Sequence, residues 1–131
     1  MPNEIKSFRD LVAWRKSMDL CKFIYGISSV FPDAERFGLT AQMRRAVVSI
    51  PSNIAEGYGR NRTQDYLRFL DIVRGSLCEV ETQLMLAQEL GWLRTDSNAG
   101  ELRVPECLEL IREVDRVLYA LVKGVERSVS K

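Results

Sequence analysis

The feature that most constrains the fold of this chain is a seam of apolar residues that runs unbroken through residues 66–87. It advances by alternating steps of four and three, and it consists of Tyr66, Leu70, Val73, Leu77, Val80, Leu84 and Ala87. Residues at this spacing share one face of an α-helix, and an apolar face of this kind packs against other helices. The rest of the chain also has helical periodicity, with no convincing strand. We therefore expect an all-α fold.

Four helices are predicted, over about residues 7–31, 40–59, 63–91 and 103–127. Their similar lengths and short connections predict an antiparallel up-down-up-down four-helix bundle. The chain has 131 residues, so we expect a single domain over 1–131.

Several residues mark the predicted helix ends. Ser7 and Asp10 form a potential capping box at the start of the first helix, and Thr63 is a potential N-cap for the third. Pro32 is expected to end the first helix. The segment 94–100 is expected to be a polar loop.

Pro51 lies in the middle of the second predicted helix. Proline lacks an N–H and clashes with the carbonyl group four residues earlier, so we expect a kink at Pro51. Ser49 and Ser52 flank this position and are candidates to satisfy the backbone groups that the proline leaves free.

Polar residues form a strip beside the apolar face of the second helix, at Gln42, Arg45, Ser49, Ser52, Asn53 and Glu56. The third helix has a similar strip at Ser76, Glu79 and Gln83. An antiparallel hairpin brings Arg45 within one turn of Glu79, so a partly buried ion pair is predicted. The strip either sets the register of the helices or lines a site in which Glu56 and Glu79 act as acid, base or metal ligand. The hairpin separates these two carboxylates by several turns, which favours the structural role.

The chain has no histidine. This absence excludes serine–histidine and cysteine–histidine nucleophile activation, and also imidazole-bound zinc. Cys21, Cys78 and Cys107 are far apart and lack CxxC spacing, so they are interpreted as free thiols. We therefore expect a non-enzymatic protein with no catalytic residues, no cofactor and no metal.

The predicted turn between the second and third helices carries a cluster that could bind nucleic acid: Tyr58, Arg60, Arg62, Tyr66 and Arg68. Arginine binds phosphate through forked donors, and tyrosine can stack on a base. The alternative is a solvated turn whose charges serve solubility. The net charge is only +1, although residues 1–76 hold 12 basic and 8 acidic side chains. No apolar run approaches the ~20 residues of a membrane helix, and no signal sequence is evident, so a cytoplasmic protein without membrane contact is expected.

Several phrases of the sequence resemble the 23S ribosomal RNA intervening-sequence protein family. They are FGLTxQxRRA at 37–46, SIPSNIAEG at 49–57, LVAW at 11–14, FP at 31–32 and GSLxEVE at 75–81. The resemblance implies a four-helix bundle that assembles into ring-like homopentamers. Some family members are encoded within insertions in ribosomal RNA genes. A related group binds nucleic acid and a reverse transcriptase through a strongly basic pentamer, whereas this chain is nearly neutral. The resemblance implies no catalytic residues.

The sequence also has more apolar surface than one bundle buries. A second stripe on the third helix, Phe69, Ile72, Leu86 and Leu90, and the residues Trp14 and Trp92 are available for an interface. We expect a homo-oligomer, a pentamer by resemblance, with weak binding to RNA or ribonucleoprotein as a hypothesis. The alternative is a protein–protein interaction scaffold that binds no nucleic acid.

Overall fold

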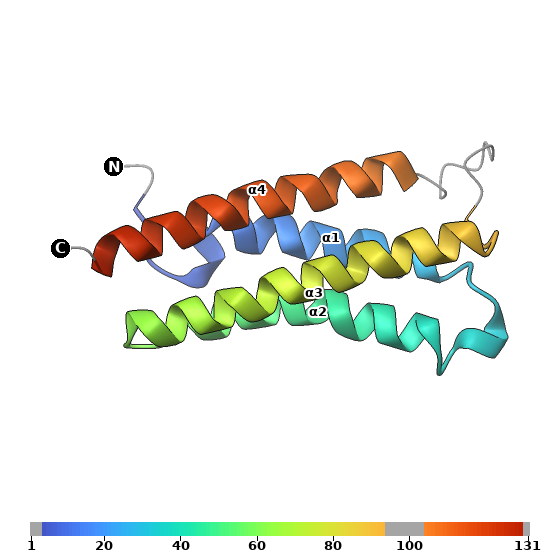
Figure 1. The fold of residues 1–131 in the computed structure, drawn as a ribbon, viewed down its shortest axis with the longest axis horizontal. Helices are drawn as coiled ribbons and strands as arrows, with labels where there is room; N and C mark the ends of the chain where they lie inside the picture. The colour runs from blue at the N-terminus through green and yellow to red at the C-terminus, as the bar shows by residue number, and fades with distance from the viewer. Residues whose placement is uncertain (1–3, 94–103, 130–131) are drawn as a thin grey trace.

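The computed structural model describes residues 4–93 and 104–129 as four long α-helices that lie side by side (Figure 1). The helices are α1 (Val12–Ser28), α2 (Leu39–Tyr58), α3 (Thr63–Glu89) and α4 (Val104–Val129). Two short 3-10 turns, η1 (Phe8–Asp10) and η2 (Asp33–Glu35), precede α1 and α2. The described residues contain no strand, so the predicted all-α fold is confirmed.

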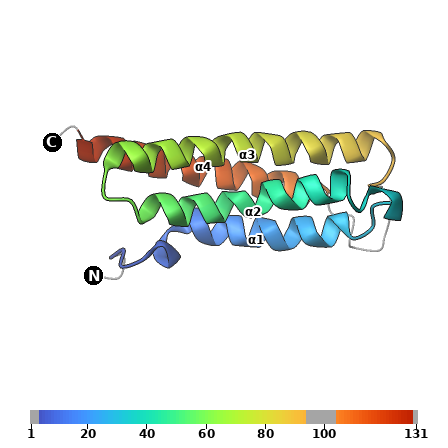
Figure 2. The ribbon, with the colours of Figure 1, turned by 90° about the horizontal axis from the view of Figure 1, so that it is seen from below.

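The helices are arranged as a ring of neighbours. α1 packs against α2, α2 against α3, α3 against α4, and α4 back against α1. Both ribbon views show consecutive helices running in opposite directions along the long axis (Figures 1 and 2), which is compatible with the predicted up-down-up-down topology. α2 and α3 share the most extensive contact.

The core lies along the axis between the four helices. Its fully buried side chains include Leu20, Ile24, Ile27, Met43, Ile50, Ile54, Leu70, Val73, Val80 and Leu84. The predicted seam of α3 forms part of this core, except that Tyr66 is only half-buried at its end. Burial of a side chain of this size contributes about 1.5–3 kcal/mol, so the helices are stable together rather than singly.

The first helix differs from its prediction at both ends. The capping box of Ser7 and Asp10 is present, but it caps η1 instead of a long helix. Leu11 is extended, with φ −75° and ψ 127°, so α1 begins only at Val12. This break allows Phe8 to pack edge-on against Trp14, with ring centroids 5.2 Å apart.

The predicted N-cap of the third helix, Thr63, was one residue late. Thr63 is already helical, and Arg62 occupies the N-cap position.

Pro51 interrupts the hydrogen-bond ladder of α2 without ending the helix. Because Pro51 has no N–H, the carbonyl of Val47 loses its partner within the helix. The thiol of Cys21 on α1 donates a hydrogen bond to this carbonyl, with Sγ 3.2 Å from the oxygen. Ser49, which we considered for this role, instead donates to the carbonyl of Ala46 over 2.7 Å. The third helix-turn of α2 is thus completed by a side chain from α1.

Two segments of the prediction fall outside the described residues. They are the polar loop 94–100 and the onset of the fourth helix before Val104.

Both tryptophans contact other rings. Trp14 packs on Phe8, and Trp92 lies against Phe31, with ring centroids 5.4 Å apart. They are partly buried against the core, so they provide less free surface than expected.

Candidate functional surfaces

The turn between α2 and α3 brings together the five residues of the predicted nucleic-acid cluster. Two of its arginines are paired with acidic neighbours. Arg60 Nη2 lies 2.8 Å from Glu56 Oε2, and Arg68 Nη2 lies 2.6 Å from Asp65 Oδ1. The Arg60 guanidinium also lies 4.8 Å from the centre of the Phe69 ring. These contacts lower the positive potential that the sequence suggested at this turn.

The two tyrosines of the cluster pack on each other. Tyr58 and Tyr66 meet edge to face, with ring centroids 6.3 Å apart, and both are partly buried against the core. Burial, together with the nearby Tyr58, raises the pKa of Tyr66 to about 12. Their rings are therefore structural, and they offer less surface for base stacking than exposed rings would.

Arg62 is the member of the cluster that is best placed to bind a phosphate. It is exposed, and within the described part of the chain it takes part in no ion pair. It also occupies the N-cap position of α3, where the helix dipole favours an anion. Among the described residues, the cluster thus presents one cation without an ion pair, Arg62, beside two that are paired.

The polar strip forms a hydrogen-bonded link between α2 and α3. Ser49 Oγ and Ser76 Oγ are 2.6 Å apart, and Asn53 Nδ2 donates to the Ser49 carbonyl over 2.7 Å. A hydroxyl has one proton, so Ser49, which donates to Ala46, accepts from Ser76. Ser49 therefore joins the two helices near the middle of their contact.

The predicted ion pair between Arg45 and Glu79 is wrong. Both side chains are exposed, and none of the ion pairs among the described residues joins them. Glu79 instead accepts from Gln83 Nε2 at 3.3 Å. The expected register is close, as the Ser49–Ser76 contact shows. The prediction was wrong about burial. Arg45 and Glu79 lie on the solvent-exposed side of the two helices, where an ion pair contributes little free energy.

Other members of the strip also lie outward. Gln42 and Glu56 are exposed, and Glu56 is held by Arg60 at the turn, far from Glu79. Gln83, by contrast, is buried, and its Oε1 has no hydrogen-bond partner among residues 4–93 and 104–129. In the parts of the chain that the structure describes, no group of His, Cys, Asp and Glu could hold a metal ion.

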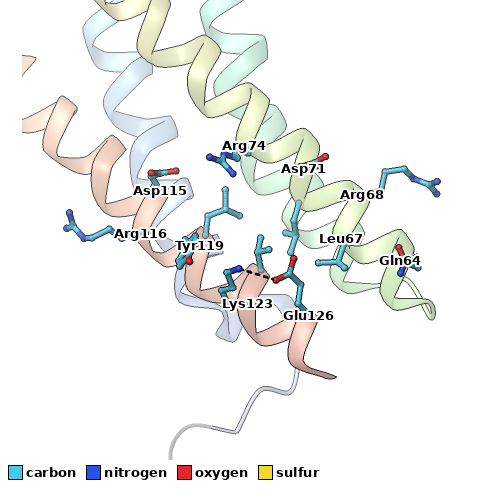
Figure 3. A pocket seen from close by; sticks show the side chains of 13 residues that line it. Gln64, Leu67, Arg68, Asp71, Arg74, Asp115, Arg116, Tyr119, Lys123 and Glu126 are labelled. Carbon is cyan, nitrogen blue, oxygen red and sulfur yellow. Dashed lines mark ion pairs between the residues drawn. The ribbon is translucent and has the colours of Figure 1, made fainter. Parts of the chain in front are cut away.

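A groove of about 960 Å³ between α3 and α4 was not predicted from the sequence (Figure 3). Leu67, Leu70, Leu118 and Val122 form its apolar lining. Its charged lining contains residues of both signs. The basic residues are Arg68, Arg74, Arg116 and Lys123, and the acidic residues are Asp71, Asp115 and Glu126. Among the described residues, no serine, threonine, cysteine or histidine lines it, so a serine, cysteine or histidine nucleophile is not part of this lining.

The charged groups of this groove partly engage one another. Lys123 Nζ lies 3.5 Å from Glu126 Oε1, as the dashed line in Figure 3 marks. Arg68 and Arg116 point away from the groove in the same view. The sequence could not reveal the groove, because its width depends on the distance between α3 and α4 and not on any residue pattern.

Cys21 and Cys107 are unsuited to nucleophilic chemistry. Burial raises the pKa of the Cys21 thiol to about 11 and that of Cys107 to about 12, so both stay protonated at neutral pH. Cys78 is exposed, and none of the three forms a disulfide.

A search for membrane-spanning helices over residues 4–93 and 104–129 found none with the length and apolar character that a span requires.

The described residues form a four-helix protein whose polar contacts lie mostly within single helices, with a few that join neighbouring helices. The model of the 23S rRNA-intervening sequence protein family matches residues 9–120, and the chain belongs to this family. The resemblance of the sequence phrases is thereby confirmed. No match to a curated protein was found.

Proposed function

We propose that this chain acts as a self-assembling helical bundle without catalytic chemistry of its own. The observation that carries this proposal is a set of three large apolar side chains of α3 that are exposed to water. Ile72, Leu86 and Leu90 are about half exposed, with Leu90 at 52%, and they flank the polar strip of α3 at both ends of one helical row. Exposed apolar residues that align along one helix mark an interface, because a monomer gains nothing from leaving them in water.

The family supports an assembly of identical copies, and a homopentamer is the specific form that we propose. Copies arranged in a ring repeat one interface around a symmetry axis. A ring also repeats any weak ligand site, which multiplies the affinity for a ligand that reaches several copies.

Light scattering at micromolar concentration tests the assembly. We expect a particle of several subunits for the natural chain and a smaller one for the double variant Leu86→Glu/Leu90→Glu. Arg74→Glu is the control, since it places an acidic group on the same helix without removing apolar surface. A monomeric natural chain would overturn the proposal.

Binding to RNA or ribonucleoprotein is a second candidate, favoured by Arg62 at the start of α3, which is exposed and forms no ion pair with the residues that the structure describes. The scaffold that binds no nucleic acid remains its alternative, and the pairing of Arg60 and Arg68 supports that alternative. Salt separates the two, because phosphate contacts weaken steeply with ionic strength whereas apolar contacts do not.

Retention on an RNA column across a salt series provides the test. If the turn binds RNA, Arg60→Glu/Arg62→Glu abolishes salt-sensitive retention. Arg112→Glu/Arg116→Glu on α4 is a matched control with the same change in charge. Equal retention of both variants would exclude the turn, and no retention of the natural chain at low salt would favour the scaffold.

A further inference from the structure

Phe37 is the most exposed large hydrophobic side chain among the described residues, at 85%. It projects from an ordered turn rather than from a loose loop. The Gly38 N–H donates to the Glu35 carbonyl over 2.9 Å, and the Leu39 N–H donates to Glu35 Oε1 over 3.0 Å. The Arg36 guanidinium lies 5.0 Å from the ring centre. An aromatic ring held out into water in this way is suited to fill an apolar hollow on another molecule.

Such a hollow of about 330 Å³ lies where α1 begins, between α1 and α4. Its lining is apolar throughout and consists of Leu11, Val12, Ala13, Val117, Ala120 and Leu121. Val12 is 51% exposed there, so water now contacts an apolar wall. A cavity of about 150 Å³ can hold benzene, so the hollow has room for a phenyl ring.

The ring of Phe37 cannot reach the hollow of its own chain. The hollow lies at the start of α1, whereas Phe37 follows the end of α1, at the opposite end of the bundle (Figure 2). The 17 residues of α1 span about 25 Å. The two features can therefore meet only between molecules.

The charges around the two features are opposite in sum. The turn 33–36 holds Asp33, Glu35 and Arg36, two acidic residues and one basic. Beside the hollow, Arg15 lies 3.8 Å from Asp10 and Lys16 lies 3.1 Å from Glu113 of α4, so Arg9 is the basic residue of the segment 9–16 that stands outside these two ion pairs. A second copy of this chain is thus a partner of the right shape and polarity, with one basic residue to meet the acidic turn. The larger groove between α3 and α4 fits a phenyl ring less well, because charged side chains make up half of its lining.

We infer that Phe37 of one copy occupies the hollow at the start of α1 in the next copy. This inference rests on the proposed self-assembly and identifies one of its contacts. Because the two surfaces differ, the contact is head-to-tail, and it closes into a ring or continues as a filament.

Two substitutions test the contact without disturbing the core. Phe37→Asp removes the ring from an exposed turn, and Ala120→Trp fills the hollow from an exposed helix position. Each is expected to weaken self-association about tenfold or more, measured by sedimentation velocity over a concentration series. Tyr119→Asp is the control, because it removes an exposed aromatic ring that faces the other groove. Circular dichroism confirms that each variant is folded.

Mixing the two variants gives the sharpest result. Phe37→Asp keeps an open hollow, and Ala120→Trp keeps the aromatic ring, so the mixture can form one head-to-tail contact and no second one. We expect the 1:1 mixture to associate more strongly than either variant alone, and equal association of the mixture and the separate variants would overturn the contact.

The outcomes separate this inference from the proposed function. A natural chain that assembles while both variants assemble equally well would overturn the contact and leave self-assembly standing. Loss of assembly in Phe37→Asp but not in Ala120→Trp would also overturn it, because the ring would then lie elsewhere. A monomeric natural chain would overturn both.

Discussion

The two sides of this bundle pack very differently. On one side, α2 and α3 meet closely, and serine hydroxyls and a glycine lie at their contact. On the other side, α4 leaves a groove against α3 and a hollow against α1. The close side is where the chain gains stability from packing, and the α4 side is where it keeps surface for a partner.

Small residues account for the close side. A Cβ atom added at Gly57 would lie 2.8 Å from the Cβ of Phe69 and 3.1 Å from Cδ1 of Tyr66. Real Cβ atoms essentially never come within 3.0 Å of another heavy atom, so the close approach of α2 to α3 depends on glycine at this position. On the α4 side, by contrast, a groove and a hollow remain between the helices, and these spaces are open to a partner.

The largest expected effect is that of Gly57→Ala on the close side. Overpacking against the Phe69 Cβ should lower the free energy of unfolding by about 1–3 kcal/mol. Gly75→Ala and Gly124→Ala are matched controls, since a Cβ at either position meets nothing within 4 Å. Both should instead raise stability by up to about 1 kcal/mol through helix propensity. Urea unfolding measures all three, and a stabilised Gly57→Ala would contradict the close packing.

A smaller effect is expected from Cys21→Ala, which leaves the carbonyl of Val47 without a donor. A buried, unsatisfied acceptor costs about 1–3 kcal/mol, and the weak thiol donor places this change at the low end. In a Pro51→Ala background the new N–H can serve Val47, so the same substitution should cost less there. Cys78→Ala is the exposed control. Equal costs in both backgrounds would show that the thiol and the proline are not coupled.

The free energy of unfolding is expected to depend on pH through buried groups on both sides of the bundle. Burial raises the pKa of Cys21 from 9.0 to about 11, of Tyr66 from 10.0 to about 12, and of Cys107 to about 12. The unfolded chain therefore releases these protons first, and stability that is full below pH 9 declines as pH rises toward 11–12. Unfolding free energies at pH 8 and pH 10 measure the decline. A constant value would indicate that these groups are less buried than described.

The smallest effect is expected at the ion pair between Lys16 and Glu113, which joins α1 to α4 at 3.1 Å. Both side chains are more than a third exposed, so a double-mutant cycle with Lys16→Met and Glu113→Gln should give about 0–1 kcal/mol. Added salt should reduce this coupling further. A coupling well above that range would show that the α4 side is held more firmly than its packing suggests.

The sequence predicted the helices better than the surfaces between them. Periodicity identified α3 within two residues of its ends, because a seam such as Leu70–Val73–Leu77 has one geometric interpretation. It could not show that Leu11 is extended, since that depends on Phe8 folding back onto Trp14. The polar strip of α2 contains both exposed and partly buried side chains. The sequence pattern could not show which were which, because Arg45 and Ser49 differ only in how far they lie from the α2–α3 contact.

The amino-acid pattern alone determined the all-α class, the antiparallel order expected of the helices, and membership in the family through phrases such as SIPSNIAEG at 49–57. These properties follow from the spacing of residues along each helix and from short sequence phrases, so the sequence contains them without any knowledge of how the helices pack. Only the tertiary structure decided that the thiol of Cys21 serves the carbonyl freed by Pro51. It alone placed Phe37 at one end of the bundle and an apolar hollow at the other. The Cys21 hydrogen bond and the hollow both depend on distances between helices, and the spacing of residues along one helix does not determine those distances.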